Sequence, residues 1–134
     1  MSPATSNPIV IVFDLAPVPA SRPRVGKFGT YYAKGYADWM KEAAGFVKVP
    51  LDVPTQAPLE VDIECVCKRP AKPTSKVPVG DVDNYAKGPL DVITKSGKVW
   101  GDDKQVVSLR VSKRYAEPGE SPHTKTTIME AAWL

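Results

Sequence analysis

Two aspartates separated by one residue lie in the stretch with the most chemistry to offer, Gly80-Asp81-Val82-Asp83-Asn84. If this stretch is extended, Asp81 and Asp83 point to the same side, because side chains alternate along a strand. Carboxylates that close repel each other unless a cation lies between them. With no histidine or cysteine nearby, their oxygen atoms suit Mg²⁺ or Mn²⁺. A plainer interpretation stays open, in which Asp83 caps a helix and Asp81 faces solvent.

Lys87 and Asp91 follow Asp83 at four-residue steps. On a helix, which the pattern predicts over 84–95, these residues share one face. Lys87 then forms a simple ion pair, or it places an ammonium beside a scissile phosphate and stabilises the charge of the transition state. Asp91 fits a partner that orients Lys87 better than it fits a metal ligand.

A second acidic pair, Asp102-Asp103, lies in a predicted turn after a short strand over 98–100. Paired acids in a turn are usually turn formers. They also offer a third carboxylate from a separate element, which the pair of Asp81 and Asp83 lacks. In phosphodiester hydrolysis, carboxylates fix one or two metal ions that activate water and stabilise the leaving oxygen.

Prolines separate the elements that must position these residues. The chain has 14 prolines among 134 residues, about twice the usual share of roughly 5%. Between them, periodicity predicts strands and helices. The fold class is α/β (α+β): a small mixed β-sheet with two helices packed on it, in the order β-α-β-α-β-β-β, as one domain over 1–134. The strands are predicted over 9–15, 59–68, 98–100, 105–115 and 124–134, and the helices over 32–49 and 84–95.

Composition excludes several classes of protein. Apolar residues make up 43% of the chain and charged residues 25%, as in ordinary globular domains. No apolar run reaches the ~20 residues of a membrane span, and no secretory signal is visible. Cys65 and Cys67 face the same way on one strand, which disfavours a disulfide and favours a reducing, cytoplasmic setting. With His123 they are too few for a four-ligand zinc site.

The net charge of +3 hides a segregation of charge. Three acid-free blocks, 15–37, 65–80 and 104–116, each carry four basic residues, and five acids lie between the second and third. Basic loops bind phosphates through counterion release, although lysines also collect on ordinary surface loops. The candidate DNA-binding residues are Arg22, Arg24, Lys27, Lys68, Arg69, Lys72 and Lys76. The third block holds Lys104, Arg110, Lys113 and Arg114.

These motifs resemble the RusA family of Holliday junction resolvases (crossover junction endodeoxyribonucleases). That family's pattern reads D-x-D-N, a lysine, L-D, a glycine and D-D-x-Q-V. The matching residues here are Asp81-Val82-Asp83-Asn84, Lys87, Leu90-Asp91, Gly97 and Asp102-Asp103-Lys104-Gln105-Val106. The segment Pro19–Arg24 is similar to the family's P-x-x-x-x-R-P-R, with looser spacing.

The resemblance implies a homodimeric, Mg²⁺-dependent endonuclease, with Mn²⁺ as a substitute. Such enzymes are often carried by phages and cut four-way DNA junctions by paired nicks in recombination and repair. Asp81 and Asp83 would be metal ligands and Lys87 the catalytic lysine. Asp103 is the preferred third ligand, with Asp102 as the alternative. Asn84, Asp91 and Gln105 would support them.

The implied setting is the cytoplasm of a bacterium or of a phage-infected host. Branched DNA would be the partner, with no membrane and no small-molecule cofactor. One alternative is a non-catalytic nucleic-acid-binding module with a structural divalent-metal site. Another is an interaction protein whose acid cluster holds a structural Ca²⁺ or Mg²⁺.

Overall fold

A four-stranded sheet forms the centre of the computed structural model, which describes residues 8–20, 24–26, 29–31, 34–49, 54–72 and 75–134. The strand order is β1 (Ile9–Phe13), β6 (His123–Glu130), β4 (Leu59–Cys67) and β5 (Val106–Tyr115). β4 and β5 are parallel, and the other two pairs are antiparallel. The sheet is therefore mixed, as predicted.

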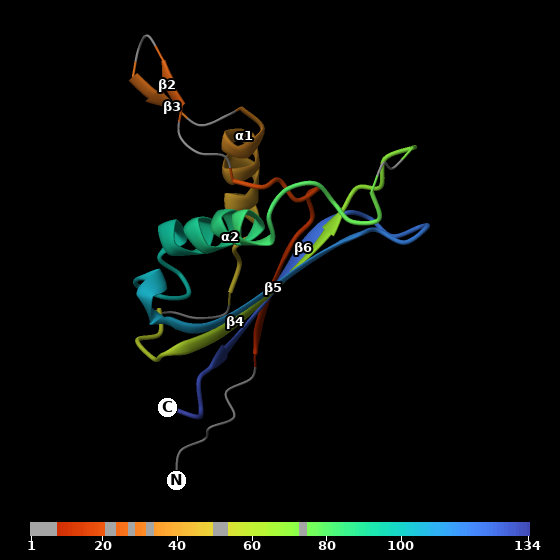
Figure 1. Cartoon of the computed structure of the whole chain (residues 1–134). Coiled ribbons are helices and arrows are strands. Elements are labelled where there is room, and N and C mark those ends of the chain that lie inside the picture. Colours follow the sequence, from red (N-terminus) through yellow and green to blue (C-terminus); the bar gives the residue numbers. More distant parts are fainter. Residues whose placement is uncertain (1–7, 21–23, 27–28, 32–33, 50–53, 73–74) are drawn as a thin grey trace.

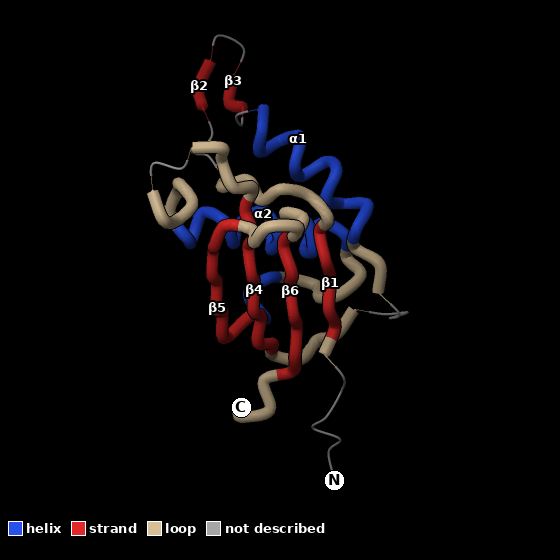
Figure 2. The backbone as a smooth tube through the Cα atoms, turned by 90° about the vertical axis from the view of Figure 1, so that its right-hand side faces the viewer, coloured by secondary structure: helices blue, strands red, loops and turns tan. Residues whose placement is uncertain are grey.

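Both helices cover the same face of this sheet (Figures 1 and 2). α2 (Val82–Ser96) connects the parallel strands β4 and β5. α1 (Lys34–Ala43) continues into a short 3₁₀ helix, η1 (Ala44–Phe46), and contacts α2. A second 3₁₀ helix, η2 (Asp103–Gln105), precedes β5. The predicted α/β (α+β) class with two helices on a mixed sheet is confirmed.

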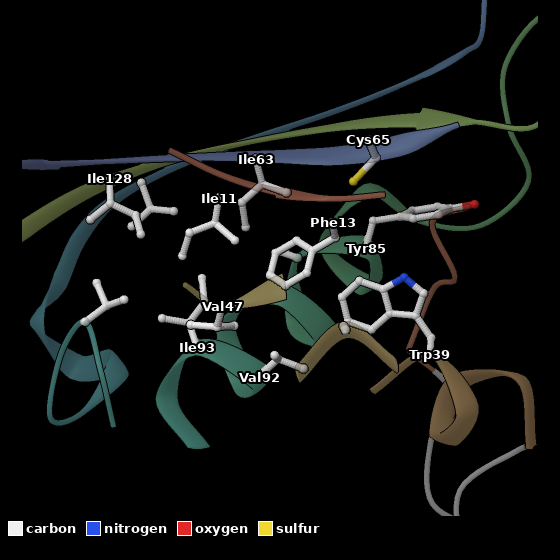
Figure 3. Packing of buried hydrophobic residues seen from close by; sticks show 14 of the residues in the cluster. Ile11, Phe13, Trp39, Val47, Ile63, Cys65, Tyr85, Val92, Ile93 and Ile128 are labelled. Carbon is white, nitrogen blue, oxygen red and sulfur yellow. The ribbon is translucent and has the colours of Figure 1, made fainter. Parts of the chain in front are cut away.

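Alternation along β4 decides which face of the sheet is buried. Leu59, Val61 and Ile63 are each at most 3% exposed, and the intervening Glu60 and Asp62 face the uncovered side. The register places the buried residues of the other strands on the same side. The core therefore fills the layer between the sheet and the helices (Figure 3). Among its members are Ile11, Phe13, Trp39, Val92, Ile93 and Ile128.

Gly88 lets α1 and α2 approach closely. A Cβ atom at Gly88 would lie 2.8 Å from Cζ3 of Trp39. The Trp39 ring in turn packs against Phe13, with ring centroids 5.4 Å apart. The contact fixes α2, and the residues it carries, relative to both α1 and β1.

Several predicted boundaries are wrong. The basic loop after β1 contains a small hairpin of β2 (Arg24–Gly26) and β3 (Gly29–Tyr31), of which only the backbone is described. The strand predicted over 98–100 is a single bridge between Trp100 and Thr55. Trp100 is fully buried and its Nε1 donates to the Thr94 hydroxyl, so its apolar signal reflects core packing. β6 ends at Glu130 instead of residue 134.

The cysteines lie in the core. Cys65 and Cys67 are buried free thiols on the helix-covered face of β4. Burial, followed by the charge of Cys67, raises the pKa of the Cys65 thiol to about 12. The described helices include none that is long and apolar enough to cross a membrane.

Candidate active site

Helix α2 begins at Val82, after the N-cap Asp81 and the preceding Gly80. Gly80 has φ of +101°, a left-handed conformation that favours glycine. The chain then passes through Asp81, which is extended, and the Asn84 amide donates to the Asp81 carbonyl at 3.0 Å. At the other end, Gly97 takes a left-handed conformation and ends the helix.

Asp81 and Asp83 are not part of one extended segment, so the condition under which both would point to the same side is not met. Asp81 is the N-cap, and Asp83 lies in the first turn of the helix. The prediction of Asp83 as N-cap is wrong for the same reason. The Asp81 side chain makes no capping hydrogen bond. Both carboxylates are exposed, and Asp83 lies near the positive end of the helix dipole.

Lys87 and Asp91 are paired on the next two turns of α2. Lys87 Nζ lies 3.2 Å from Asp91 Oδ2. The same oxygen accepts a hydrogen bond from the Tyr36 hydroxyl on α1, at 3.4 Å. Tyr36 is only 3% exposed. A buried tyrosine thus holds the carboxylate that in turn holds the Lys87 ammonium.

Asp102 and Asp103 do different things in the structure. Asp102 caps η2, because its side chain accepts from the Lys104 amide at 2.8 Å. Gln105 completes this capping box through its Oε1, which accepts from the amides of Gly101 and Asp102. Gln105 Nε2 donates to the carbonyls of Thr55 and Ala57, which fixes η2 against the segment before β4. The Asp103 side chain, in contrast, lies beside residues of α2.

A cavity of about 440 Å³ lies between α2, β5 and η2. Leu109 and Val111 of β5 contribute apolar surface to it. Asp83, Lys87, Asp91 and Asp103 all line it, together with Val82, Ala86 and Leu90. Asp81 does not line this cavity. The fold therefore brings a residue from η2 together with three that α2 displays at four-residue intervals.

The electrostatics of the two adjacent acids are opposite. The pKa of Asp103 is raised, first by desolvation of its carboxyl, then by a hydrogen bond with Asp102 and by the charges of Asp102 and Asp91, while Lys87 partly offsets them. The pKa of Asp102 is lowered, chiefly by the hydrogen bond from the Lys104 amide. Negative charge thus accumulates at Asp103, where a cation would relieve the repulsion.

These residues fit a divalent metal by their chemistry. The donors are carboxylate oxygens, which suit Mg²⁺. Within the described part of the chain, no three acidic, histidine or cysteine side chains are close enough together to hold a metal by themselves. Mg²⁺ in phosphoryl-transfer sites is commonly held by one or two carboxylates, waters and substrate phosphates, so a closed protein cage is not required.

The comparison with protein families matches residues 14–129 to the model of the endodeoxyribonuclease RusA. The chain belongs to this family. A similar protein from Bacillus subtilis (strain 168), described as the uncharacterized protein YqaN, is 34% identical over 91 residues. That match covers 63% of this chain and 58% of YqaN, so the chain spans just over half the length of this relative.

The second basic block lies in the loop between β4 and α2 of this RusA-family chain. Lys68, Lys72 and Lys76 are exposed. Arg69 is also exposed, and its guanidinium lies 5.2 Å from the Tyr115 ring centroid while Nε donates to the Ala116 carbonyl. The loop ends at the start of α2 (Figure 1), and Asp81 and Asp83 follow it directly in the sequence.

The first basic block is described only in part. Arg22 and Lys27 lie outside the described residues, and only the backbone of Arg24 is described, in β2. The segment before it is tied to α2, because the Ala20 amide donates to the Asn84 carbonyl at 2.8 Å. This bond joins the region of the Pro19–Arg24 motif to the region of the D-x-D-N motif.

The third basic block follows the strand prediction over 105–115. Most of it forms β5. Arg114 makes a bidentate ion pair with Glu120, at 2.7 and 2.8 Å. Arg110 pairs in register with Asp62 on the uncovered face of the sheet, away from α2. Lys113 points to the covered face and binds backbone carbonyls.

A count of charges does not distinguish Lys113, which binds backbone carbonyls, from the surface lysines. It lies on the same face of β5 as Leu109, Val111 and Tyr115, the face covered by α2. A lysine at an inward position of an alternating strand needs polar partners. That position in the pattern was the signal that could have separated Lys113 from the surface lysines.

Proposed function

We propose that this chain is a Mg²⁺-dependent, structure-selective DNA endonuclease that resolves four-way junctions in recombination and repair. The observation that carries the proposal is the cavity lined by Asp83, Lys87, Asp91 and Asp103 in a chain of the RusA family. Carboxylates and a cationic side chain around one opening are what phosphodiester hydrolysis requires.

Asp83 and Asp103 would hold the metal, with Asp81 as a further ligand at the helix start. Mn²⁺ would substitute for Mg²⁺. When bound, the metal supplies an activated water and stabilises the leaving oxygen. Asp102 would act on this site through η2, because its carboxylate is already engaged with the Lys104 amide.

Lys87 would contribute a fixed positive charge beside the phosphate. Its partner Asp91 is held by Tyr36, so the ammonium is oriented before substrate arrives. A preoriented charge stabilises a transition state without reorganisation during the reaction. Asn84 and Gln105 would support the site, the first at the start of α2 and the second through η2.

DNA would bind along the exposed basic residues Lys68, Arg69, Lys72 and Lys76, together with Arg22, Arg24 and Lys27. The loop that carries the first four leads directly into the N-terminus of α2. Backbone phosphates held by this loop would therefore enter the site from its acidic end. Two coordinated nicks in one junction call for two such sites, which a two-fold homodimer supplies.

The test is cleavage of a synthetic four-way junction in Mg²⁺, beside linear duplexes of the same sequence. We expect paired, symmetric nicks confined to the junction. Asp83→Asn should reduce cleavage to background while junction binding persists. Asp62→Asn, on the uncovered face of the sheet, is the matched control and should cleave as wild type does.

The outcome also separates the alternative of a non-catalytic binding module. Junction binding without nicking by the wild-type chain, in either Mg²⁺ or Mn²⁺, would support that alternative. Nicking that survives Asp83→Asn would remove Asp83 from the site. Sedimentation of the junction complex would report whether two copies of the chain are bound.

A further inference from the structure

Four consecutive backbone carbonyls just before α2 each accept a hydrogen bond from a side chain. Tyr115 donates to the Val77 carbonyl at 3.1 Å, and Tyr85 to the Val79 carbonyl at 2.5 Å. Lys113 Nζ donates to both Pro78 and Gly80, at 2.6 and 2.5 Å. The segment 77–80 is therefore held by side chains of β5 and α2 rather than by another strand.

Lys113 makes the strongest hydrogen bonds of this set, because its ammonium is charged. One of them reaches the residue that precedes Asp81. Charge-assisted hydrogen bonds are roughly twice as strong as those between neutral groups. One of its two acceptors belongs to Gly80, which directly precedes Asp81. Gly80 is closely packed, because a Cβ added there would meet the side chains of Tyr85 at 3.3 Å and Pro19 at 3.4 Å.

The position of Asp81 depends on this segment. The Asp81 side chain makes no capping bond of its own, and the place of its Cβ atom follows from the backbone that leads into the helix. If the carbonyls of Pro78 and Gly80 lost their donor, the backbone before Asp81 could rotate. The helix start and the first-turn Asp83 would then lose one of their constraints.

We propose that Lys113 is a positioning residue that fixes Asp81 and the start of α2 for metal binding. This inference rests on the proposed function, because it takes Asp81 and Asp83 as metal ligands. Lys113 touches neither metal nor substrate and acts through the carbonyls of Pro78 and Gly80. Residues that orient the ligands of a metal typically change affinity or activity by about 10–100-fold when mutated.

The variants are Lys113→Met, which removes the donors, and Lys113→Arg, which retains positive charge and can donate to two carbonyls. Lys125→Met is the control, because Lys125 is exposed on the opposite face of the same sheet, on strand β6. Tyr115→Phe removes only the bond to Val77, which is farther from Asp81 than the bonds of Lys113.

The readouts are Mn²⁺ binding followed by electron paramagnetic resonance, amide hydrogen exchange of 77–84, thermal unfolding, and junction cleavage against metal concentration. In Lys113→Met we expect exchange of 77–84 to rise while that of β1 and β6 is unchanged. Mn²⁺ affinity should fall by about 10-fold or more. Lys113→Arg should restore most of the affinity, and Tyr115→Phe should have a smaller effect than Lys113→Met.

Faster exchange in Lys113→Met with unchanged Mn²⁺ affinity and cleavage would overturn the proposal, because Lys113 would then only anchor a loop. A wild-type chain that fails to bind Mn²⁺ would overturn it too. A wild-type chain that binds Mn²⁺ but cuts no junction would contradict the proposed function alone. The Mn²⁺ affinities of the variants would still decide the role of Lys113. If Lys113→Met does not fold, the Mn²⁺ affinities of Lys113→Arg and Tyr115→Phe, each compared with wild type, decide the role of Lys113.

Discussion

Lys87 Nζ and Asp91 Oδ2 are 3.2 Å apart, one helical turn from each other, on the face of α2 that lines the cavity. Both side chains remain partly exposed, at 48% and 30%. Exposed ion pairs of this kind contribute only about 0.2–1 kcal/mol to stability. The pair is therefore better suited to orient an ammonium than to hold the fold together.

Replacing Lys87 by methionine should reduce the rate of junction cleavage without unfolding the chain. The expected loss in kcat is about 10²–10³-fold, as for removal of one preoriented group from a transition state. Asp91→Asn should have a smaller effect, because Lys87 keeps its charge but loses its ionic partner. Lys95→Met, at the C-terminal end of the same helix, is the control. Wild-type cleavage by Lys87→Met would rule out its proposed role.

Asp103 and Asp102 should respond to pH in opposite directions. The pKa of Asp103 is raised in the folded chain, so the stability that its protonated form provides is lost as pH rises through that pKa. Asp103→Asn should therefore raise the unfolding temperature at pH 7, and this gain should vanish well below the ordinary value of 3.8. Thermal unfolding of wild type and Asp103→Asn from pH 2 to pH 8 measures both the gain at pH 7 and its loss at low pH.

Asp102 is the internal comparison for Asp103. Its pKa is lowered, so it stabilises the folded chain above the ordinary value and that stability is lost as pH falls. Asp102→Asn should lower the unfolding temperature at pH 7. Adding Mg²⁺ should stabilise the wild type and Asp102→Asn, but stabilise Asp103→Asn much less. Equal stabilisation of all three by Mg²⁺ would contradict Asp103 as a ligand.

The exposed lysines of the loop between β4 and α2 should set the salt dependence of DNA binding. Each phosphate contact that is removed should reduce the slope of log affinity against log salt concentration by about 0.9 on duplex DNA. We expect this for single alanine variants of Lys68, Lys72 and Lys76, measured by fluorescence anisotropy. Lys125→Ala should leave the slope unchanged, and an unchanged slope in all three loop variants would place the DNA elsewhere.

The contact between Gly88 and Trp39 should make Gly88→Ala destabilising. The added methyl group would lie 2.8 Å from the Trp39 ring, so the two helices or the ring must move. Overpacking of this kind costs about 1–3 kcal/mol, measurable by urea unfolding. Gly45→Ala is the matched control, because no atom of the described residues would lie within 4 Å of a Cβ at Gly45. Equal stability of the two variants would contradict the close approach of α1 and α2.

The periodicity of apolar residues predicts the type of those elements whose pattern is local in the sequence. Alternation along β4 and the helical spacing in α2 gave the correct element types. The two-stranded hairpin of β2 and β3 was missed, because Arg24–Gly26 and Gly29–Tyr31 are short and carry little apolar pattern. The apolar pattern over 98–100 predicts a strand, although the apolar character of Trp100 reflects burial in the core.

Local sequence patterns do not predict contacts between residues that are far apart in the chain. The D-x-D spacing alone could not show that the helix begins between Asp81 and Asp83. Gly80 and the donors from Lys113 and Tyr85 constrain the segment that leads to this start. Counting charge also treated all lysines alike, whereas Lys113 is engaged by carbonyls 33 and 35 residues away. The motif gives candidate acids, and the fold shows which of them line one cavity.

The parallel pairing of β4 with β5 has a consequence for how this chemistry is encoded. Because α2 is the crossover between these strands, all the acidic residues proposed for the site, and Lys113, come from one uninterrupted stretch of chain. β1, β6 and α1 complete the core around that stretch, with Tyr36 of α1 reaching Asp91. Substitutions in β1, β6 and α1 that keep the core packed can therefore accumulate without altering the linear motif.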